Sequence, residues 1–226
     1  DEFRKIYKKE GADIIFLCLP NNPMGECLDA KDVYKFLDEI DKNTLVVLDG
    51  AYQEYATYKD GAKKLNVKKV VKKYSNVIYL GTFSKAYALG GLRVGYGIAD
   101  TKIVKNLYKL RPPFNVTTLS LEGGKVALKD EKFVQKCIKK NFEEMSRYEK
   151  YSKRNGLKYI PSYTNFITIY TGNYISKEIA QQLLEQGIIV RDMTGYGQNA
   201  IRITIGTESQ NTKVFKALDK LLVVKK

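Results

Sequence analysis

ADIIFLCLP (residues 12–20) is the stretch that decides how the first half of this chain is interpreted. It is short, continuous and apolar, and three later runs share its character: TLVVLD (44–49), NVIYLG (76–81) and GLRVGYGIA (91–99). Runs of this length are typical of strands buried on both faces of a parallel sheet. The sequence therefore predicts four buried strands within residues 12–99.

A helix is expected between the first two strands. Asp29 can cap it, and its apolar positions, which recur at helical spacing, are Val33, Phe36, Leu37 and Ile40. Strands that alternate with helices predict an α/β fold with a mostly parallel sheet covered by helices.

The second half of the chain has a different pattern after residues 112–113, two consecutive prolines. Residues 130–154 read as one long amphipathic helix, with an inner stripe of Phe133, Cys137, Phe142, Met145 and Tyr148. The elements expected beyond it are strands at 165–170, 188–193 and 201–206 and helices at 176–186 and 209–222. We therefore expect a large domain over 1–129, a connecting helix over 130–154 and a small α+β domain over 155–226.

Composition excludes several kinds of chemistry. The chain contains no histidine, so within it acid–base work must fall to Lys, Tyr, Asp or Glu. The 39 basic residues exceed the 25 acidic ones, which gives a net charge of +14. The basic residues are spread along the chain, which favours a solvated basic surface over a nucleic-acid partner and leaves a basic path for anionic ligands as the alternative.

The lengths of the apolar runs and the number of cysteines indicate the cellular compartment of the protein. No run is long enough to span a bilayer, so we expect no membrane partner. Cys18, Cys27 and Cys137 are odd in number and lack metal-site spacing, which argues against a disulfide framework or a zinc site and suits a reducing cytoplasm.

The segment TFSKAYALGGLRVG (82–95) carries the strongest chemical signal. Thr82 and Ser84 precede Lys85, a Gly-Gly turn follows it, and Arg93 comes eight residues later. Two hydroxyls and a guanidinium around one loop can bind a phosphate. A lysine desolvated beside cations loses its proton readily and can attack an aldehyde to form a Schiff base. The alternative is a polar turn that caps a helix, with Lys85 merely solvated.

Three further segments add polar groups beside strands. Asp49 in DGAY ends an apolar strand and suits a protonated ring nitrogen, and Tyr52 can donate to an oxygen of the same ring; a strand-ending helix cap is the alternative. PNNPMG (20–25) forms a turn that presents Asn22 as an amide donor. Arg202 in AIRITIG lies among apolar residues and needs an anionic partner, either a substrate carboxylate or a structural ion pair.

Together these motifs resemble the fold-type I pyridoxal-phosphate enzymes of the aminotransferase family. NNPMG resembles the family's Asn-Pro-x-Gly turn, DGAY its Asp-x-x-Tyr, TFSKAYALGGLRVG its cofactor segment and IRITIG its substrate anchor. The resemblance implies that Lys85 binds the cofactor covalently and moves protons, and that Asp49 holds the ring nitrogen protonated. It also implies ring-oxygen contacts by Asn22 and Tyr52. The remaining implied roles are phosphate binding by Thr82, Ser84 and Arg93 and substrate binding by Arg202.

Within the family, the closest likeness is to the branch that transaminates histidinol phosphate in histidine biosynthesis. It is carried by TFSKAYALGGLRVGYGIA, KLRPPFNV, GIIVRDM and AIRITIGT, and implies substrate-binding roles for Arg191 and Asn165. Aromatic aminotransferases and a phosphothreonine decarboxylase resemble the same pattern, and a non-catalytic relative is a further alternative.

The same likeness implies partners and a missing segment. The partners would be small amino and keto substrates and a second copy, in a homodimer with shared active sites. The family's Gly-rich phosphate loop and its ring-stacking aromatic residue lie before the point where this chain starts, so we expect a longer N-terminal portion.

Overall fold

The computed structural model describes residues 2–222, and the chain divides into two compact units. Unit 1 contains the chain up to Asn21 together with Cys27–Val134. Unit 2 contains Asn22–Glu26 and the chain from Gln135 onward. The division into 1–129, 130–154 and 155–226 stays a prediction about the domains of the whole protein.

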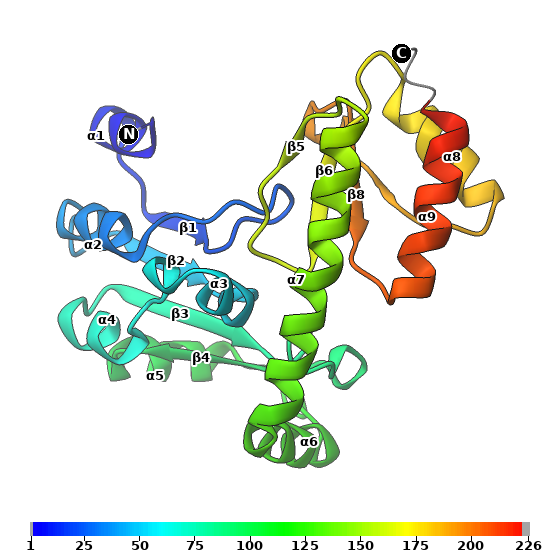
Figure 1. The fold of residues 1–226 in the computed structure, drawn as a ribbon. Coiled ribbons are helices and arrows are strands. Elements are labelled where there is room, and N and C mark those ends of the chain that lie inside the picture. Colours follow the sequence, from blue (N-terminus) through cyan, green and yellow to red (C-terminus); the bar gives the residue numbers. More distant parts are fainter. Residues whose placement is uncertain (1, 223–226) are drawn as a thin grey trace. The chain divides into compact units, whose positions relative to one another are not determined.

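Unit 1 is built on a four-stranded sheet in the order β1-β2-β3-β4 (Figure 1). The strands are β1 (Ile14–Cys18), β2 (Leu45–Asp49), β3 (Val77–Thr82) and β4 (Gly95–Ala99). The first three pair in parallel, and β4 pairs with β3 in the antiparallel direction. The mostly parallel sheet with helices confirms the expected α/β class. The last strand begins later than expected, because Gly90–Leu92 form a 3₁₀ turn before it.

Helices precede, connect and follow the strands of unit 1. They are α1 (Glu2–Glu10), α2 (Ala30–Asp38), α3 (Gln53–Lys59), α4 (Val67–Lys73), α5 (Thr101–Leu110) and α6 (Thr118–Lys129). Helix α2 buries Val33, Phe36 and Leu37 in one core with Val46 and Leu48 of β2. This packing confirms the expected apolar face of α2.

Asp29 does not cap α2 with its side chain. It occupies the N-cap position, but its Oδ1 accepts a hydrogen bond from Lys63 Nζ at 2.6 Å. The Lys63 ammonium is the main reason that the pKa of Asp29 is lowered. The expected cap is therefore replaced by an ion pair that ties α2 to the 3₁₀ turn Gly61–Lys63.

Unit 2 carries an antiparallel sheet in the order β5-β6-β8-β7. Its strands are β5 (Tyr159–Ile160), β6 (Phe166–Tyr170), β7 (Arg191–Asp192) and β8 (Ala200–Thr204). Its helices are α8 (Ser176–Glu185), α9 (Glu208–Leu221) and the greater part of α7 (Glu131–Arg154). The expected strand at 188–193 shrinks to the two residues of β7.

The buried stripe of α7 differs from the expected one. Met145 and Tyr148 are buried as predicted, but Phe133 is 43% exposed, while the neighbouring Val134 and Ile138 are buried. Because 134, 138, 145 and 148 follow the spacing of one helix face, that face rather than the one through Phe133 meets the core.

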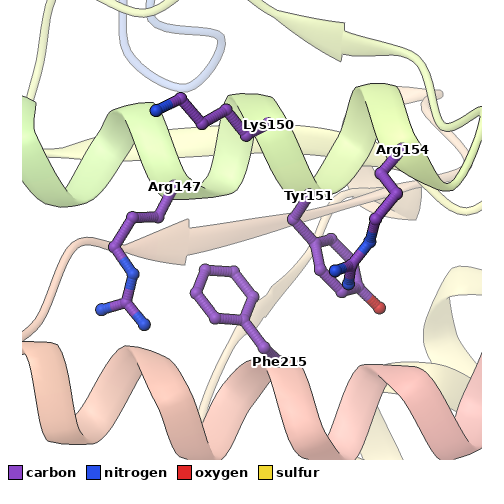
Figure 2. Close-up of a pocket in the computed structure, with 5 residues that line it drawn as sticks. All are labelled: Arg147, Lys150, Tyr151, Arg154 and Phe215. Carbon is purple, nitrogen blue, oxygen red and sulfur yellow. The ribbon is translucent and has the colours of Figure 1, made fainter.

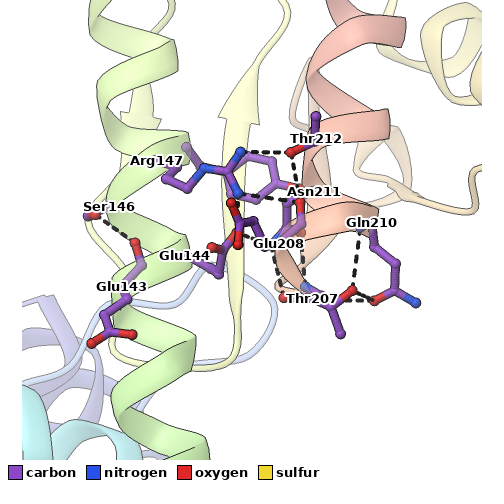
Figure 3. Close-up of polar contacts among 11 residues, drawn as sticks. Glu143, Glu144, Ser146, Arg147, Thr207, Glu208, Gln210, Asn211 and Thr212 are labelled. Atoms are coloured by element: carbon purple, nitrogen blue, oxygen red, sulfur yellow. Dashed lines mark hydrogen bonds and ion pairs between the residues drawn. The ribbon is translucent and has the colours of Figure 1, made fainter.

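A polar network joins α7 to α9 within unit 2 (Figure 3). The Tyr148 hydroxyl donates to Asn211 Oδ1 at 2.9 Å, and Asn211 Nδ2 donates to Glu144 Oε2 at 2.7 Å. Arg147 Nη1 donates to the same carboxylate oxygen at 2.7 Å. Thr207 and Gln210 form a capping box at the start of α9. The network fixes the start of α9 against the middle of α7.

In the part of the chain that is described, no helix combines the length and the hydrophobicity that crossing a bilayer requires.

Candidate active site

Two neighbouring parallel strands of unit 1 end in polar residues at the same sheet edge. Asp49 ends β2 and Thr82 ends β3, and Asp49 lies opposite Leu80 in the register of the pair. Ligands of open α/β sheets bind outside the carboxyl ends of the strands. This edge is therefore the candidate site of unit 1.

Asp49 is half-buried, and the turn after it fixes its carboxylate. Its Oδ1 accepts a hydrogen bond from the Ala51 N–H at 2.9 Å. Gly50 is buried against the Tyr79 ring, and a Cβ added at this position would overlap that ring. Glycine therefore lets Tyr79 pack under the turn that presents Asp49.

Tyr52 and Lys85 come close together at this edge. Tyr52 stands at the N-cap position of α3 and is 5% exposed. The Lys85 side chain is exposed, and its Nζ lies 5.5 Å from the centroid of the Tyr52 ring. The desolvation expected for Lys85 is therefore not supplied by the described residues. An exposed amine above a tyrosine ring is accessible to a ligand that enters at this edge.

The three residues expected to bind phosphate surround one loop. The Ser84 N–H donates to Thr82 Oγ1 at 3.1 Å. Arg93 Nη1 donates to the Gly90 carbonyl at 2.9 Å and approaches Ser84 Oγ at 3.5 Å. Arg93 has a φ of 50°, in the left-handed region. The loop thus folds the guanidinium back toward the Ser84 hydroxyl.

Arg202 and Asn22 lie together in unit 2. Arg202 Nη1 donates to Asn22 Oδ1 at 2.6 Å, and its guanidinium carbon is 4.6 Å from the centroid of the Phe166 ring. The hydrogen bond assigns Oδ1 of Asn22 to the arginine, which leaves the Nδ2 group of Asn22 as a donor for a ligand. The expected amide donor is therefore oriented by the expected substrate anchor.

Two arginines face each other across strands β7 and β8. Arg191 and Arg202 are directly opposite in the register, so their side chains leave the sheet on the same face. Like charges opposite each other on neighbouring strands are destabilising. A bound anion would relieve this repulsion.

Asn165, the other residue expected to bind substrate, directly precedes β6, and its carbonyl accepts a hydrogen bond from the Ile205 N–H at 2.8 Å.

One titratable residue near the unit 1 site was not singled out by the sequence motifs. Glu54 is half-buried in α3, two residues after Tyr52, and burial raises its pKa to about 7. Its carboxylate in turn contributes, after burial, to the raised pKa of Tyr87, about 12, and of Tyr96. The signal in the sequence that could have identified Glu54 is an acidic residue on the helix that follows DGAY.

The structure thus brings the expected site residues together in two sets. The set of unit 1 is Asp49, Tyr52, Thr82, Ser84, Lys85 and Arg93. The set of unit 2 is Asn22, Asn165, Arg191 and Arg202. Each set is held by contacts within its own unit.

Comparison with known proteins gives consistent matches. The sequence profile of the aminotransferase class I and II family matches residues 1–218. Histidinol-phosphate aminotransferase of Aliarcobacter butzleri is 65% identical over 223 residues, which are 98% of this chain and 61% of that protein. The protein of the same name from Sulfurimonas denitrificans is 59% identical over the same shares of the two chains.

A solved structure matches the fold closely. Histidinol-phosphate aminotransferase of Sinorhizobium meliloti, in complex with pyridoxal-5'-phosphate, superimposes with a TM-score of 0.88 at 26% identity. The match covers 97% of this chain and 60% of that one. The chain therefore spans about 61% of the length of the curated relatives that it matches.

Proposed function

Because this chain belongs to the class I and II aminotransferases, we propose that the whole protein is a pyridoxal-phosphate-dependent histidinol-phosphate aminotransferase. It would convert histidinol phosphate and 2-oxoglutarate into imidazole acetol phosphate and glutamate, in histidine biosynthesis. The relatives at 65% and 59% identity support this substrate assignment. The observation that carries the proposal is the set of unit 1, which places Asp49, Tyr52 and Lys85 at one sheet edge.

The side chains of unit 1 fit pyridoxal phosphate. One carboxylate oxygen of Asp49 is held by the Ala51 N–H, and the other can accept a hydrogen bond from the ring nitrogen. Thr82, Ser84 and Arg93 supply two hydroxyls and a guanidinium around one loop, which is the donor set that a phosphate dianion prefers. When bound, the cofactor supplies an electron sink for a carbanion.

The chain's own groups then have separate tasks. Lys85 would hold the cofactor through its aldehyde group and would move the proton at the substrate α-carbon. Asp49 would keep the ring nitrogen protonated. Tyr52 would donate a hydrogen bond to the ring oxygen.

Arg191 and Arg202 support the assignment of an anionic substrate. Their opposed guanidinium groups can share the phosphate of histidinol phosphate, which has no α-carboxylate, or hold the α-carboxylate of glutamate. Asn165, which directly precedes β6, would supply a further donor. One pair of arginines can thus serve both half-reactions.

We also propose that the protein works as a cytoplasmic homodimer with shared active sites. Cys18, Cys27 and Cys137 are odd in number and lack metal-site spacing, which suits a reducing compartment. Exposed apolar side chains are concentrated between residues 107 and 128 of unit 1, where Phe114 is 98% exposed. Large exposed apolar patches mark protein interfaces, and these residues are the ones we assign to the dimer contact.

The half-reaction tests the proposal. The cofactor-loaded, full-length protein is mixed with histidinol phosphate without a keto acid, and the visible absorbance is followed. We expect the visible band to bleach and to return when 2-oxoglutarate is added. If glutamate bleaches the band but histidinol phosphate does not, the protein is an aminotransferase but the proposed substrate is wrong.

A further inference from the structure

Unit 2 contains an open pocket on the side of α7 that meets α9 (Figure 2). Its volume is about 380 Å³, and its lining residues are Arg147, Lys150, Tyr151 and Arg154 of α7 and Phe215 of α9. This volume lies within the range of about 300–1,000 Å³ typical of small-molecule sites. No lining residue belongs to the two sets described above.

The three cations of the pocket follow one face of α7. Residues 147, 150, 151 and 154 have the spacing of neighbours on a helix surface. At about 1.5 Å of rise per residue, Arg147 and Arg154 are separated by about 10 Å along the helix axis. Lys150 lies between them in the sequence, and Figure 2 shows its side chain extended along α7 on the side away from the Phe215 ring. The two arginine positions are separated by about the length of a chain of several phosphoryl groups.

Contacts within unit 2 hold Arg147 in place. It donates to Glu144 at 2.7 Å and to Thr212 Oγ1 at 2.8 Å, and its guanidinium carbon is 5.2 Å from the centroid of the Phe215 ring. Figure 2 shows Arg147 and Arg154 on opposite sides of the Phe215 and Tyr151 rings. The Glu144 carboxylate offsets part of the Arg147 charge, so Arg147 alone would be a weak anion ligand.

Arg154 and Lys150 make weaker contacts within the protein than Arg147 does. Arg154 Nη2 is 4.0 Å from Asp219 Oδ1, and both side chains are mostly exposed, at 69% and 52%, so this ion pair contributes little. Within residues 2–222, the Lys150 ammonium makes no ion pair or hydrogen bond. Lys150 has a flexible side chain without an ion pair, Arg154 is only weakly paired, and no lining residue is acidic. These features favour an anion.

The floor of the pocket is aromatic. The Tyr151 and Phe215 rings stack with centroids 5.1 Å apart. Burial, followed by a hydrogen bond with Asp219, raises the pKa of the Tyr151 hydroxyl, so Tyr151 stays neutral. Phe215 is half-buried and exposes part of its ring to a ligand. An apolar floor beside these cations suits a ligand with both an anionic and an apolar part.

We propose that this pocket binds a small molecule that carries two or more linked phosphoryl groups. A single phosphate can contact only neighbouring cations, because the outer two are about 10 Å apart. A diphosphate or triphosphate can contact Lys150 and Arg154 together. The free oligophosphate and a nucleoside di- or triphosphate share this chemistry, and the nucleoside part would cover Phe215.

Isothermal titration calorimetry of the full-length, cofactor-loaded protein with inorganic triphosphate tests the proposal. Loading with cofactor fills the phosphate site of unit 1. At an ionic strength of about 0.15 M, where diffuse surface charge is screened, we expect saturable binding at one site per chain. Orthophosphate should bind at least about tenfold more weakly, since it forgoes one charge-assisted contact.

Charge-reversal variants separate the pocket from the general basic surface. Lys150→Glu and Arg154→Glu should each weaken triphosphate binding at least about tenfold. Lys153→Glu changes the net charge equally, lies on the same helix and does not line the pocket, so it should weaken binding at most about twofold. Equal losses in the three variants would show diffuse attraction and overturn the proposal.

Further outcomes test the proposal and identify the ligand. Absence of saturable binding, or displacement of triphosphate by saturating histidinol phosphate, would also overturn the proposal, the latter because the anion would then occupy the substrate site. ATP that binds more tightly than triphosphate, with the difference lost in Phe215→Ala, would support a nucleotide as the ligand. Equal binding of the two would support the free oligophosphate.

Discussion

Replacing Glu54 by Gln should make the protein more stable at alkaline pH. Burial raises the pKa of Glu54 from 4.5 to about 7, so the folded protein holds a proton that the unfolded chain has released. Stability therefore falls as the pH rises from about 4.5 to about 7 and stays reduced above that. The difference between the two pKa values corresponds to at most about 3 kcal/mol of unfolding free energy.

Urea unfolding of the full-length wild type and of Glu54→Gln, followed by circular dichroism, measures this difference. At pH 5 the two proteins should differ little, because Glu54 is largely protonated in the wild type. At pH 8 the variant should be more stable by up to about 3 kcal/mol. Glu26→Gln, the same substitution at an exposed position, should change stability by less than about 0.5 kcal/mol at both pH values.

The reasoning would be refuted by a Glu54→Gln variant that is less stable than the wild type at pH 8. That result would mean that the carboxylate is ionised and stabilised by a charged partner. A difference that is the same at pH 5 and pH 8 would also count against it, because a change in packing rather than in titration would then be responsible.

Three further substitutions have defined outcomes. Asn211→Ala should lower the unfolding free energy by about 2–4 kcal/mol, measured by thermal or urea unfolding, because it leaves the Tyr148 hydroxyl and Glu144 without their buried partner; an unchanged stability would contradict the network. Gly50→Ala should weaken cofactor binding, measured by spectroscopic titration, because the new Cβ displaces Tyr79 beneath Asp49; wild-type affinity would show that the turn adapts. Arg202→Ala should raise KM for amino and keto substrates about thirtyfold, because it removes charged hydrogen bonding worth about 2 kcal/mol. Unchanged KM values would show that Arg202 is not part of the site.

The strands and the long helix were predictable because their signals are local. The apolar runs before Cys18 and Asp49 and the continuous helical pattern of 130–154 each specify an element without reference to the rest of the chain. The bounds of the strand at the edge of the sheet were harder to predict. The strand expected from residue 91 begins at Gly95, since the Gly90–Leu92 turn and the left-handed backbone of Arg93 serve the loop rather than the sheet.

Tertiary contacts explain what the sequence could not give. Asp29 has the residue type of a helix cap, but a lysine 34 positions later takes its carboxylate. The burial of Val134 instead of Phe133 depends on which face of α7 meets the core. The pairing of Arg202 with Asn22, 180 positions apart, and the opposition of Arg202 and Arg191 follow only from the folded sheet.

The central claim is that Lys85 is the residue that holds the cofactor. Borohydride reduction of the cofactor-loaded protein, followed by proteolysis and mass spectrometry, identifies the lysine that is bonded to it. The account predicts the reduced cofactor on the peptide that contains Lys85, with no labelled peptide from a Lys85→Ala protein treated in the same way. Label on another lysine, or equal labelling of the Lys85→Ala protein, would contradict the account.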